Sequence, residues 1–484
     1  MHLGDLLPAD VKLPAGAREI AIAGITADSR AVAPNFLFAA LQGTNTDGSR
    51  FVGEAVSRGV AAILTGADAR IEAGVPVIRV DDPRHVLALA AARFHPRQPA
   101  HLVAVTGTSG KTSVADFTRQ IFAAAGFSAA SIGTLGIVTA RCTEYGTLTT
   151  PDPVAFHATL DRLAGEGVTH AAVEASSQGL DQRRVDGLRI EAAAFTNLGR
   201  DHMDYHPTVE AYLAAKLRLF TAVLPPNGTA VVAMDGDRAE EVLAVARGRG
   251  QKLIRVGEAG EEIRLLSAVP HDFRQTLVAD VFGKRIEVIL PLAGVFQASN
   301  ALVAAGLAIA SGIAPDAAFA ALAHLNGAPG RLQLAGRKAN GALVFVDYAH
   351  KPDAILGALA ALRPMTKGRL VIVFGAGGNR DPGKRPMMGE AAANSADVVI
   401  VTDDNPRFEN AAAIRKAIIA GAPAAVEIAD RREAIGTAVA MLEAGDVLVV
   451  AGKGHESGQI VGEKTIPFSD REAVVAALAE EEAA

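Results

Sequence analysis

Short runs of apolar residues recur along the chain, and each ends at small or polar residues that precede a segment with helical periodicity. In the clearest example, the run LVAVT from Leu102 leads into the glycine turn GTSGKTS and an amphipathic stretch from about Val114 to Ala125. Runs that are apolar throughout are typical of strands buried on both faces of a parallel sheet. Comparable runs end at Glu174, Asn197, Asp235, Asp347, Gly375, Asp403 and Gly452. The pattern predicts an α/β fold that is doubly wound more than once.

Two polar, Pro- and Gly-containing segments interrupt this pattern. HPRQPAH at 95–101 precedes the first strong strand, and LNGAPGRLQ at 325–333 precedes the final set of strands. They divide the 484 residues into three predicted domains, 1–99, 100–329 and 330–484. At ~150 residues per domain, three is also the number expected from length alone.

The composition narrows the class of protein. Hydrophobic residues make up 50% and charged residues 21%, which is typical of a packed globular protein and excludes a mainly disordered, collagen-like or coiled-coil chain. A net charge of −6 argues against non-specific binding to nucleic acid. Cys142 is the only cysteine, which excludes an intramolecular disulfide and a Cys-rich zinc site. No signal peptide or bilayer-spanning run is recognisable, so we expect a cytoplasmic protein with no membrane partner.

The GTSGKTS turn lies between a predicted strand and a predicted helix, which is the setting of a phosphate-binding loop. Its glycines allow backbone N–H groups to face phosphate oxygens at the positive end of the helix. Lys111 would reach the terminal phosphates and Thr112 would bind Mg²⁺, although Val105 stands where the strict motif has glycine. A glycine-rich turn formed by chance is the alternative. The loop consists of Gly107, Thr108, Ser109, Gly110, Lys111, Thr112 and Ser113.

Further polar residues follow the next predicted strands. Glu174 could hold Mg²⁺, or it could be a helix N-cap or a paired surface charge. A loop rich in His and Asp follows the strand that ends at Asn197; it is compatible with a second metal, a general base or a polar helix cap. By composition alone Lys216 is expected to be a solvated helix lysine. The loop contains Arg200, Asp201, His202, Asp204 and His206.

In the last block, four polar segments follow predicted strands: DYAHKP (347–352), GGNRDPGKRP (377–386), DDNPR (403–407) and AGKGHE (451–456). Together they supply arginine, lysine and carboxylate side chains. This mixture suits a zwitterionic ligand, because a guanidinium pairs with a carboxylate and a carboxylate pairs with an ammonium group.

With these motifs in order, the chain closely resembles the Mur ligases, and within them the diaminopimelate-adding branch. The resemblance also includes TADSR, TTPDP, EASSQGLDQRRV, TNLGRDHMDYH and PGRLQ, so that it spans essentially the whole chain. It implies a UDP-binding first domain, a central ATPase with a P-loop-type parallel sheet, and a Rossmann-like carboxyl-terminal domain. In this family the loop is GTxGK[ST], so Val105 is no departure from the pattern.

The resemblance assigns roles residue by residue. Lys111, His202 and Lys216 would be catalytic, and Thr112, Glu174, His202 and Lys216 would surround Mg²⁺. Lys216 matches a lysine that is carbamylated in the family, which reverses the interpretation from composition. Asn300, Arg331 and Asp347 would join the glycine loop in binding ATP. Ser29, Thr149, Thr150, Ser176, Gln182 and Arg184 would bind the UDP-muramoyl substrate, whereas the segment from Thr44 to Asp47 is less regular.

The DNPR segment resembles the signature of the diaminopimelate-adding enzymes. Arg407 could pair with the distal carboxylate of diaminopimelate, and a lysine substrate would leave it without that anion. The resemblance adds Arg380, Asp404, Asn405, Pro406, Gly452 and Glu456 to this amino-acid site.

The activity implied is ATP-dependent addition of meso-2,6-diaminopimelate to UDP-N-acetylmuramoyl-L-alanyl-D-glutamate in peptidoglycan precursor synthesis, and we expect a monomer with no nucleic-acid partner. A lysine-adding or folylpolyglutamate-type ligase would share GTSGKTS, but DNPR and GGNRDPGKRP favour the diaminopimelate branch. A nucleotide-dependent switch is a rival from another class, yet no NKxD element follows a strand. A purely structural protein would not explain so many polar residues at strand ends.

Overall fold

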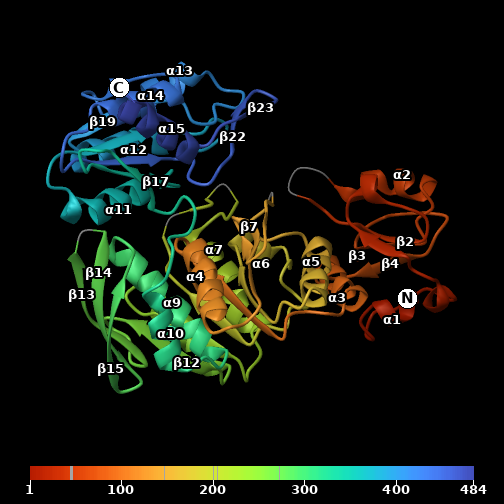
Figure 1. The fold of residues 1–484 in the computed structure, drawn as a ribbon. Helices are drawn as coiled ribbons and strands as arrows, with labels where there is room; N and C mark the ends of the chain where they lie inside the picture. The colour runs from red at the N-terminus through yellow and green to blue at the C-terminus, as the bar shows by residue number, and fades with distance from the viewer. Residues whose placement is uncertain (44–46, 147, 200, 204, 272, 484) are drawn as a thin grey trace. The chain divides into compact units, whose positions relative to one another are not determined.

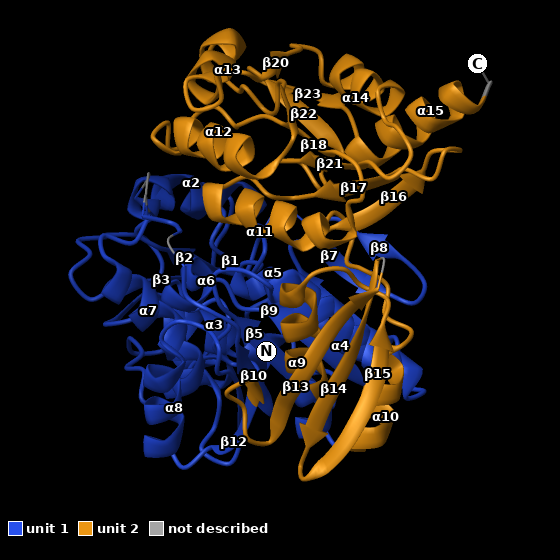
Figure 2. Ribbon diagram, turned by 90° about the vertical axis from the view of Figure 1, so that its left-hand side faces the viewer, with its two compact units in different colours: residues 1–255, 306–313 blue, residues 256–305, 314–484 orange. Residues whose placement is uncertain are grey.

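The computed structural model describes residues 1–43, 47–146, 148–199, 201–203, 205–271 and 273–483. The chain forms two compact units, shown in Figure 2: unit 1 comprises 1–255 with 306–313, and unit 2 comprises 256–305 with 314–484. Two of the three boundaries fall within strand β12 (Lys252–Gly257) and helix α9 (Val295–Ala310), and the third follows α9 at 313/314. Among the described residues, no helix combines the length and apolar character needed to cross a membrane.

Unit 1 begins with a small parallel sheet of order β1-β2-β3-β4 (Figure 1). Alternation along the strands gives it two apolar faces. Leu37 and Leu64 lie in a core with α1 and α3, whereas Phe38 and Ile63 lie in a second core with α2. The elements are α1 (Leu3–Leu6), β1 (Gly24–Thr26), β2 (Phe36–Ala40), α2 (Val52–Ser57), β3 (Ala62–Gly66), β4 (Val77–Val80) and α3 (Pro83–Phe94).

Unit 1 also contains seven strands of an 11-stranded sheet, in the order β11-β10-β5-β9-β6-β7-β8. Its central strands β10, β5, β9 and β6 are parallel and fully apolar over most of their length, which explains why the sequence pattern identified them. The strands are β5 (His101–Thr106), β6 (Ala129–Gly133), β7 (Gly136–Thr139), β8 (Thr143–Glu144), β9 (His170–Glu174), β10 (Ala192–Phe195) and β11 (Thr229–Ala233).

Helices cover this sheet and connect its strands. Phe156 of α5, Leu180 of α6 and Leu243 of α8 pack in one core with β5, β9, β10 and β11, while α4 packs against β5, β6 and β9. The helices are α4 (Lys111–Ala124), α5 (Pro153–Gly165), α6 (Ser177–Asp181), α7 (Val209–Arg218) and α8 (Ala239–Gly248). The segment 95–100 between α3 and β5 contains neither helix nor strand, as predicted.

Polar contacts join the small sheet's last helix, α3, to the residues that follow α6 (Ser177–Asp181). Arg183 donates to Asp82, the N-cap of α3, at 2.7 Å, and His85 Nδ1 lies 2.6 Å from Asp186 Oδ2. Asp186 also accepts two bonds from Arg218, at 2.6 and 2.7 Å. These contacts hold the residues that flank Arg184 in place.

Unit 2 contains an antiparallel element that the apolar-run pattern did not predict. Strands β13 (Ile263–His271), β14 (Arg274–Val281) and β15 (Lys284–Leu290) form a meander, followed by α9 and α10 (Pro315–Leu322). Strands β13 and β15 bury only some of their residues. They therefore lack the continuous apolar runs from which the other strands were predicted.

The second sheet of unit 2 has the order β16-β17-β21-β18-β19-β20, parallel except for edge strand β16. Ile372 and Val449 pack on one face with α11, α12 and α13; Val373 and Leu448 pack on the other with α14 and α15. This part is doubly wound, as predicted. Its elements are β16 (Gln333–Arg337), β17 (Leu343–Asp347), α11 (Pro352–Leu362), β18 (Leu370–Phe374), α12 (Lys384–Ser395), β19 (Val398–Val401), α13 (Ala411–Ile419), β20 (Val426–Glu427), α14 (Arg431–Ala440), β21 (Val447–Ala451), β22 (Gly458–Val461), β23 (Lys464–Pro467) and α15 (Asp470–Ala483).

One histidine of unit 1 makes stability depend on pH. His170 at the start of β9 stacks on His101 with ring centroids 4.4 Å apart and lies 4.1 Å from the ring of Phe127. Burial, and secondarily the charge of His101, lowers the pKa of His170 to about 4. As pH falls from about 6.5 to about 4, the unfolded chain gains a proton that the folded chain does not, so stability is lost on acidification.

We expect His170→Phe to lose about 1–2 kcal/mol less free energy of unfolding than the unaltered chain when the pH falls from 7 to 5, after allowance for solvent screening. Thermal unfolding midpoints at pH 7 and pH 5 would measure it, with His324→Phe, an exposed histidine of unit 2, as the control. An equal fall in midpoint for His170→Phe and the unaltered chain would contradict the assignment.

Candidate active site

The glycine loop joins the end of β5 to the start of α4. Gly107 has φ +146° and Gly110, the residue before α4, has φ +88°, conformations that favour glycine. A Cβ on Gly107 would lie 1.9 Å from Thr196 Oγ1. The Lys111 ammonium group donates to the carbonyls of Gly107 and Thr108 at 2.8 and 3.0 Å. The loop therefore has the strand, turn and helix of the predicted phosphate-binding loop.

The residues that follow the neighbouring strand β10 form hydrogen bonds with the backbone of the loop. Ser109 N donates to Asn197 Oδ1 at 3.0 Å, and Thr196 Oγ1 donates to Ser109 O at 2.6 Å. Thr108 N donates to Asn197 O at 2.9 Å. These bonds hold the loop's backbone in one conformation.

Glu174 is a buried carboxylate at the end of β9, only 2% exposed. Its Oε2 accepts from Thr112 Oγ1 at 3.1 Å and from Thr134 Oγ1 at 3.2 Å, and its Oε1 accepts from Thr134 N at 2.8 Å. A Cβ on Gly133 would lie 2.1 Å from Oε1, so the close approach needs glycine. The alternative that Glu174 is a surface charge is wrong, and so is the helix-cap alternative, because Ser176 caps α6.

Lys216 lies in the last turn of α7 and is 1% exposed. Its Nζ donates to Gly107 O at 2.7 Å and stands 4.2 Å from the centroid of the Tyr212 ring. Burial raises the pKa of Tyr212, whose hydroxyl lies 3.1 Å from Thr108 Oγ1. The interpretation of Lys216 from composition, a solvated lysine, is therefore wrong: the helix turns it inward to the glycine loop.

The loop before α7 is only partly described, since Arg200 and Asp204 lie outside the described residues. His202 is exposed, has φ +53°, and its Nε2 lies 3.3 Å from Asp201 Oδ2. The helix cap is Thr208, whose Oγ1 accepts from Ala211 N at 3.1 Å, so the cap is not formed by the His and Asp side chains. Whether this loop holds a metal or acts as a base stays a prediction.

A second polar cluster in unit 1 contains five residues predicted to bind substrate. Thr149 Oγ1 lies 3.0 Å from Thr134 Oγ1, and Thr150 Oγ1 donates to Glu174 O at 2.8 Å and to Ser176 Oγ at 3.0 Å. The Arg184 guanidinium donates to Thr150 O at 2.8 Å and to Gln182 Oε1 at 2.7 Å. Burial lowers the pKa of Arg184. The structure thus brings Thr149, Thr150, Ser176, Gln182 and Arg184 together beside Glu174.

The small sheet contributes Ser29, which is buried and donates to Glu54 Oε2 at 3.1 Å. In the Thr44–Asp47 segment only Asp47 is described, and it caps a short helical turn.

In unit 2, three residues predicted to bind nucleotide lie near the end of β17. The carboxylate of Asp347 accepts from Leu332 N and Ala349 N at 2.6 and 2.7 Å, and burial raises its pKa against the opposing effect of Arg331. The Arg331 guanidinium stands 4.6 Å from the centroid of the Tyr348 ring. Asn300 on α9 is linked to Arg331 through Gln297, which accepts from Asn300 at 3.2 Å and donates to Arg331 O at 3.2 Å.

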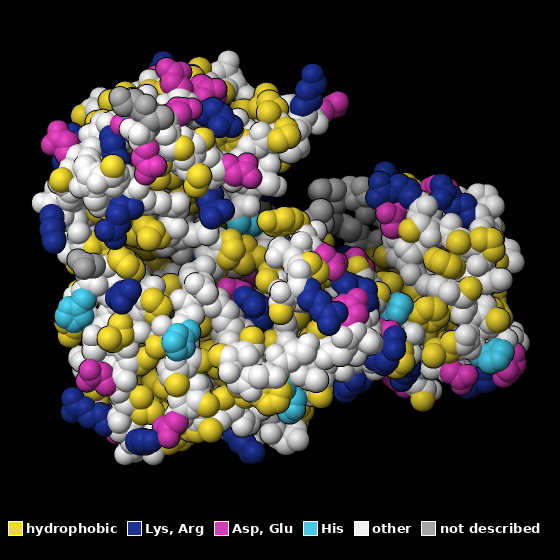
Figure 3. Space-filling model, in the orientation of Figure 1, with side chains coloured by type: hydrophobic (Ala, Val, Ile, Leu, Met, Phe, Trp, Pro, Cys, Tyr) yellow, Lys and Arg dark blue, Asp and Glu magenta, His cyan; other side chains and the backbone are white. Residues whose placement is uncertain are grey.

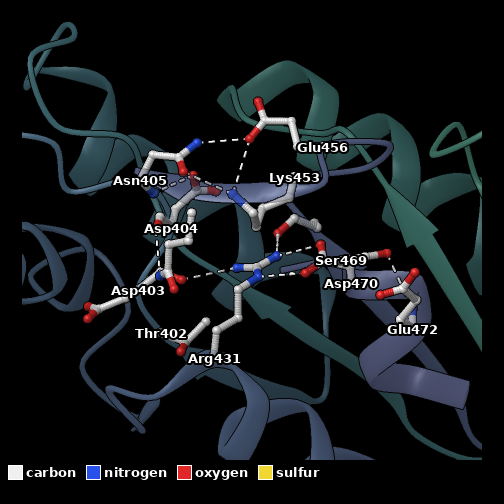
Figure 4. A network of polar contacts seen from close by, with 12 residues as sticks. Thr402, Asp403, Asp404, Asn405, Arg431, Lys453, Glu456, Ser469, Asp470 and Glu472 are labelled. Atoms are coloured by element: carbon white, nitrogen blue, oxygen red, sulfur yellow. Dashed lines mark hydrogen bonds and ion pairs between the residues drawn. The ribbon is translucent and has the colours of Figure 1, made fainter. Parts of the chain in front are cut away.

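The loops after β19 and β21 form the network drawn in Figure 4. Asn405 Nδ2 donates to Glu456 Oε2 at 2.8 Å, and the fully buried Lys453 donates to Asn405 Oδ1 and Glu456 Oε2 at 3.0 and 3.1 Å. Asp404 Oδ1 accepts from Asn405 N at 2.6 Å, and Asp404 Oδ2 lies 2.6 Å from the place a Cβ on Gly452 would take. Asp404, Asn405, Gly452 and Glu456 are thus neighbours, as the resemblance implies.

Arginines flank this network. Arg407 has φ +51° and donates to Gly378 O at 2.9 Å, and Pro406 before it is buried. Arg380, in the loop after β18, is exposed. Sequence reasoning missed Thr134, Tyr212 and the buried Arg431; none stands in a motif, and only their contacts mark them.

On the face shown in Figure 3, lysine and arginine side chains are interspersed with aspartate and glutamate, without the extended basic stripe that a nucleic-acid backbone would need.

Comparison with known proteins extends this picture. Three domain descriptions match successive parts of the chain: "Mur ligase family, catalytic domain" over residues 21–95, "Mur ligase middle domain" over 105–308, and "Mur ligase, glutamate ligase domain" over 330–454. The chain belongs to the Mur ligase family.

Relatives within the family match over almost the full length. The UDP-N-acetylmuramoyl-L-alanyl-D-glutamate–2,6-diaminopimelate ligase of Brucella melitensis is 57% identical over 96% of each chain, and that of Bradyrhizobium diazoefficiens is 56% identical over 99% of each. A solved structure of a ligase with the same name is 31% identical, with a TM-score of 0.72 over 98% of each chain. The Mur ligase fold, with its three-domain architecture, is therefore shared.

The donors at the glycine loop of this Mur ligase fit Mg²⁺. Thr112 and Glu174 offer hydroxyl and carboxylate oxygens, and Mg²⁺ is held in such sites by one or two carboxylates together with water and substrate phosphates. In the described part of the chain, no group of three or more His, Cys, Asp or Glu side chains could hold a metal on its own.

We expect Gly107→Ala to lower the midpoint of thermal unfolding by about 5–10 °C, because the added Cβ collides with Thr196 and strains the backbone. Gly126→Ala is the matched control: it has φ +89° but open space around it, and we expect a loss of about 2–4 °C. Equal shifts in scanning calorimetry would show that the contact with Thr196 does not constrain the loop.

Proposed function

We propose that this chain is an ATP-dependent ligase that joins meso-2,6-diaminopimelate to UDP-N-acetylmuramoyl-L-alanyl-D-glutamate. The observation that carries the proposal is full-length identity of up to 57% to ligases named for this reaction. It is supported by a half-buried Arg407 beside a carboxylate and amide network, which suits a ligand with two amino-acid heads. The product would serve peptidoglycan synthesis, and with it cell shape and division, in the cytoplasm.

The reaction divides into two steps. The γ-phosphoryl group of ATP passes to the side-chain carboxylate of the D-glutamyl residue, which gives an acyl phosphate and ADP. An amine of diaminopimelate then attacks the acyl carbon, loses a proton, and displaces inorganic phosphate as the amide forms. Both steps develop negative charge on phosphoryl oxygens, and fixed cations and N–H donors stabilise that charge.

The glycine loop would hold the phosphates of ATP. Lys111 now donates to two loop carbonyls, and it would transfer these bonds to phosphate oxygens while the N–H groups of Gly107–Ser113 and the start of α4 face the same anion. Bound Mg²⁺, held by Thr112 and Glu174 with support from His202 and Lys216, would neutralise phosphate charge. Asn300, Arg331 and Asp347 are the further proposed nucleotide contacts.

The remaining residues would position the two other substrates. Ser29, Thr149, Thr150, Ser176, Gln182 and Arg184 are proposed to bind the UDP-muramoyl dipeptide. Asp404, Asn405, Glu456 and Gly452 would bind the distal ammonium side of diaminopimelate, and Arg380, Arg407 and the turn at Pro406 its carboxylate. A lysine-adding ligase is the alternative. Arg407 argues against it, because a lysine substrate would leave this arginine without a carboxylate partner.

We expect purified protein with Mg-ATP and the UDP-muramoyl dipeptide to release phosphate when meso-diaminopimelate is added and not when L-lysine replaces it, with the tripeptide product identified by mass. Arg407→Leu should reduce kcat/KM for diaminopimelate by about 10²-fold or more, because a carboxylate loses its bidentate partner. Arg432→Leu, at an arginine on α14 stacked on Phe468, is the control. Release with lysine would keep a ligase but reject the role of Arg407, and no release with either would reject the substrate assignment.

Lys216 is proposed to be carbamylated and to act as a metal support. Lys216→Ala should then lose most activity, and high bicarbonate should not restore it, because the variant has no amine to carbamylate. Lys252→Ala, an exposed lysine at the start of β12, should keep normal activity. Near-normal turnover of Lys216→Ala in the phosphate-release assay would reject the assignment.

A further inference from the structure

The loops proposed to bind diaminopimelate lie over an ion pair that has no assigned role. Arg431 is the first residue of α14 and Asp470 the first residue of α15, and the side chains of both are 0% exposed. Arg431 Nε and Nη2 donate to Asp470 Oδ1 and Oδ2 at 2.7 and 2.8 Å, a bidentate pair visible at the centre of Figure 4.

The same guanidinium also reaches two strand ends. Arg431 Nη2 donates to Ala451 O at 2.8 Å, at the end of β21, and Nη1 donates to Asp403 O at 3.3 Å, just beyond β19. In the sheet order β21-β18-β19 these strands are not neighbours, because β18 lies between them. No sheet hydrogen bond can therefore join the two ends directly. Arg431 connects them at their carbonyls, in addition to the bonds that Asn405 makes with Lys453 and Glu456 farther along the loops.

Each carbonyl that Arg431 holds lies directly before a proposed ligand-binding segment. Ala451 precedes Gly452, and Asp403 precedes Asp404–Arg407. The two segments are close, since a Cβ on Gly452 would stand 2.6 Å from Asp404 Oδ2 and 3.8 Å from Arg431 Nη2. A shift of either carbonyl would change the distance between Asp404 and Gly452.

Stability alone does not account for such a pair. A buried ion pair can often be replaced by apolar residues of similar volume without loss of stability, so the contacts it makes with other groups are the place to look for its role. Lysine could not take the place of Arg431, because a single ammonium group lacks the planar fork that pairs with a carboxylate and reaches two carbonyls as well.

We propose that Arg431, held by Asp470, is a positioning residue for the amino-acid substrate: it fixes the loops after β19 and β21 in register and thereby sets affinity for diaminopimelate. The inference rests on the proposed function for the identity of this ligand. It predicts that loss of the pair impairs diaminopimelate binding while ATP and UDP-dipeptide binding stay unchanged.

The test uses the full chain with the double variant Arg431→Met/Asp470→Leu, which removes both charges together and avoids an unpaired buried charge. We expect KM for meso-diaminopimelate to rise at least ten-fold, and KM for ATP and for the UDP-dipeptide to change less than two-fold. Arg431→Lys should lie between the double variant and the unaltered chain. Arg369→Met is the matched control, because Arg369 pairs with Asp446 at the opposite, amino-terminal ends of β18 and β21.

Hydrogen–deuterium exchange of the ligand-free proteins provides a readout that needs no substrate. We expect at least ten-fold faster exchange in peptides covering 402–408 and 451–457 of the double variant, with unchanged exchange over 101–124. Unchanged loop exchange, or an unchanged KM for diaminopimelate in a variant with altered loops, would overturn the proposal.

Two other outcomes remain distinguishable. If the unaltered chain shows no diaminopimelate-dependent turnover, the proposed function fails, and loop exchange alone decides whether Arg431 orders the loops. If the double variant does not fold, Arg431→Lys and Asp470→Asn replace it. Each should raise KM for diaminopimelate and speed loop exchange in the same direction but by less than the double variant, and no change in either quantity would overturn the proposal.

Discussion

Burial of the Glu174 carboxyl group is the constraint on which the arrangement of polar residues at the strand ends of unit 1 depends. A carboxyl group with 2% exposure requires hydrogen-bond partners, and it obtains them from the first turn of α4 and from the residue after β6. The main-chain carbonyl of the same residue accepts from Thr150, which in turn meets Ser176. One buried residue thus ties the glycine loop, the β6–β7 turn and the cluster around Arg184 to the end of a single strand, and the small residue at Gly133 is the condition for its approach.

Unit 2 also buries charged groups at its strand ends, but these groups carry the opposite charge. There the buried groups are cations, Arg431 and Lys453, and the carboxylates of Asp470 and Glu456 balance them. A buried carboxyl group with hydroxyl neighbours offers oxygen donors of the kind that Mg²⁺ prefers. Buried cations, with carbonyls and amides held around them, favour a fixed loop geometry in which a half-buried arginine can recognise an anionic ligand. Both arrangements lie at the carboxyl ends of parallel strands, where open α/β sheets bind their ligands.

The sequence predicts the parallel strands because each is apolar throughout, a pattern that burial on two faces imposes. It predicts the glycine loop because backbone conformation and chemistry coincide in seven residues. It does not predict the meander of β13–β15, whose strands expose many of their residues. The solvated interpretation of Lys216 failed for another reason: its acceptor, Gly107 O, lies 109 positions away in the sequence. Arg431 escaped notice for the same reason, since its importance arises from which strands are neighbours and not from its sequence context.

The surroundings of Lys216 bear on its proposed carbamylation. Two of its contacts, a carbonyl oxygen at 2.7 Å and the face of Tyr212 at 4.2 Å, attract an ammonium group and would repel a carbamate anion. Burial alone would also disfavour the anion. Addition of CO₂ at this position therefore requires either a change in these contacts or a nearby cation that offsets the new charge. If Mg²⁺ supplies that cation, carbamylation and metal binding stabilise each other, and by linkage each raises the equilibrium constant of the other by the same factor.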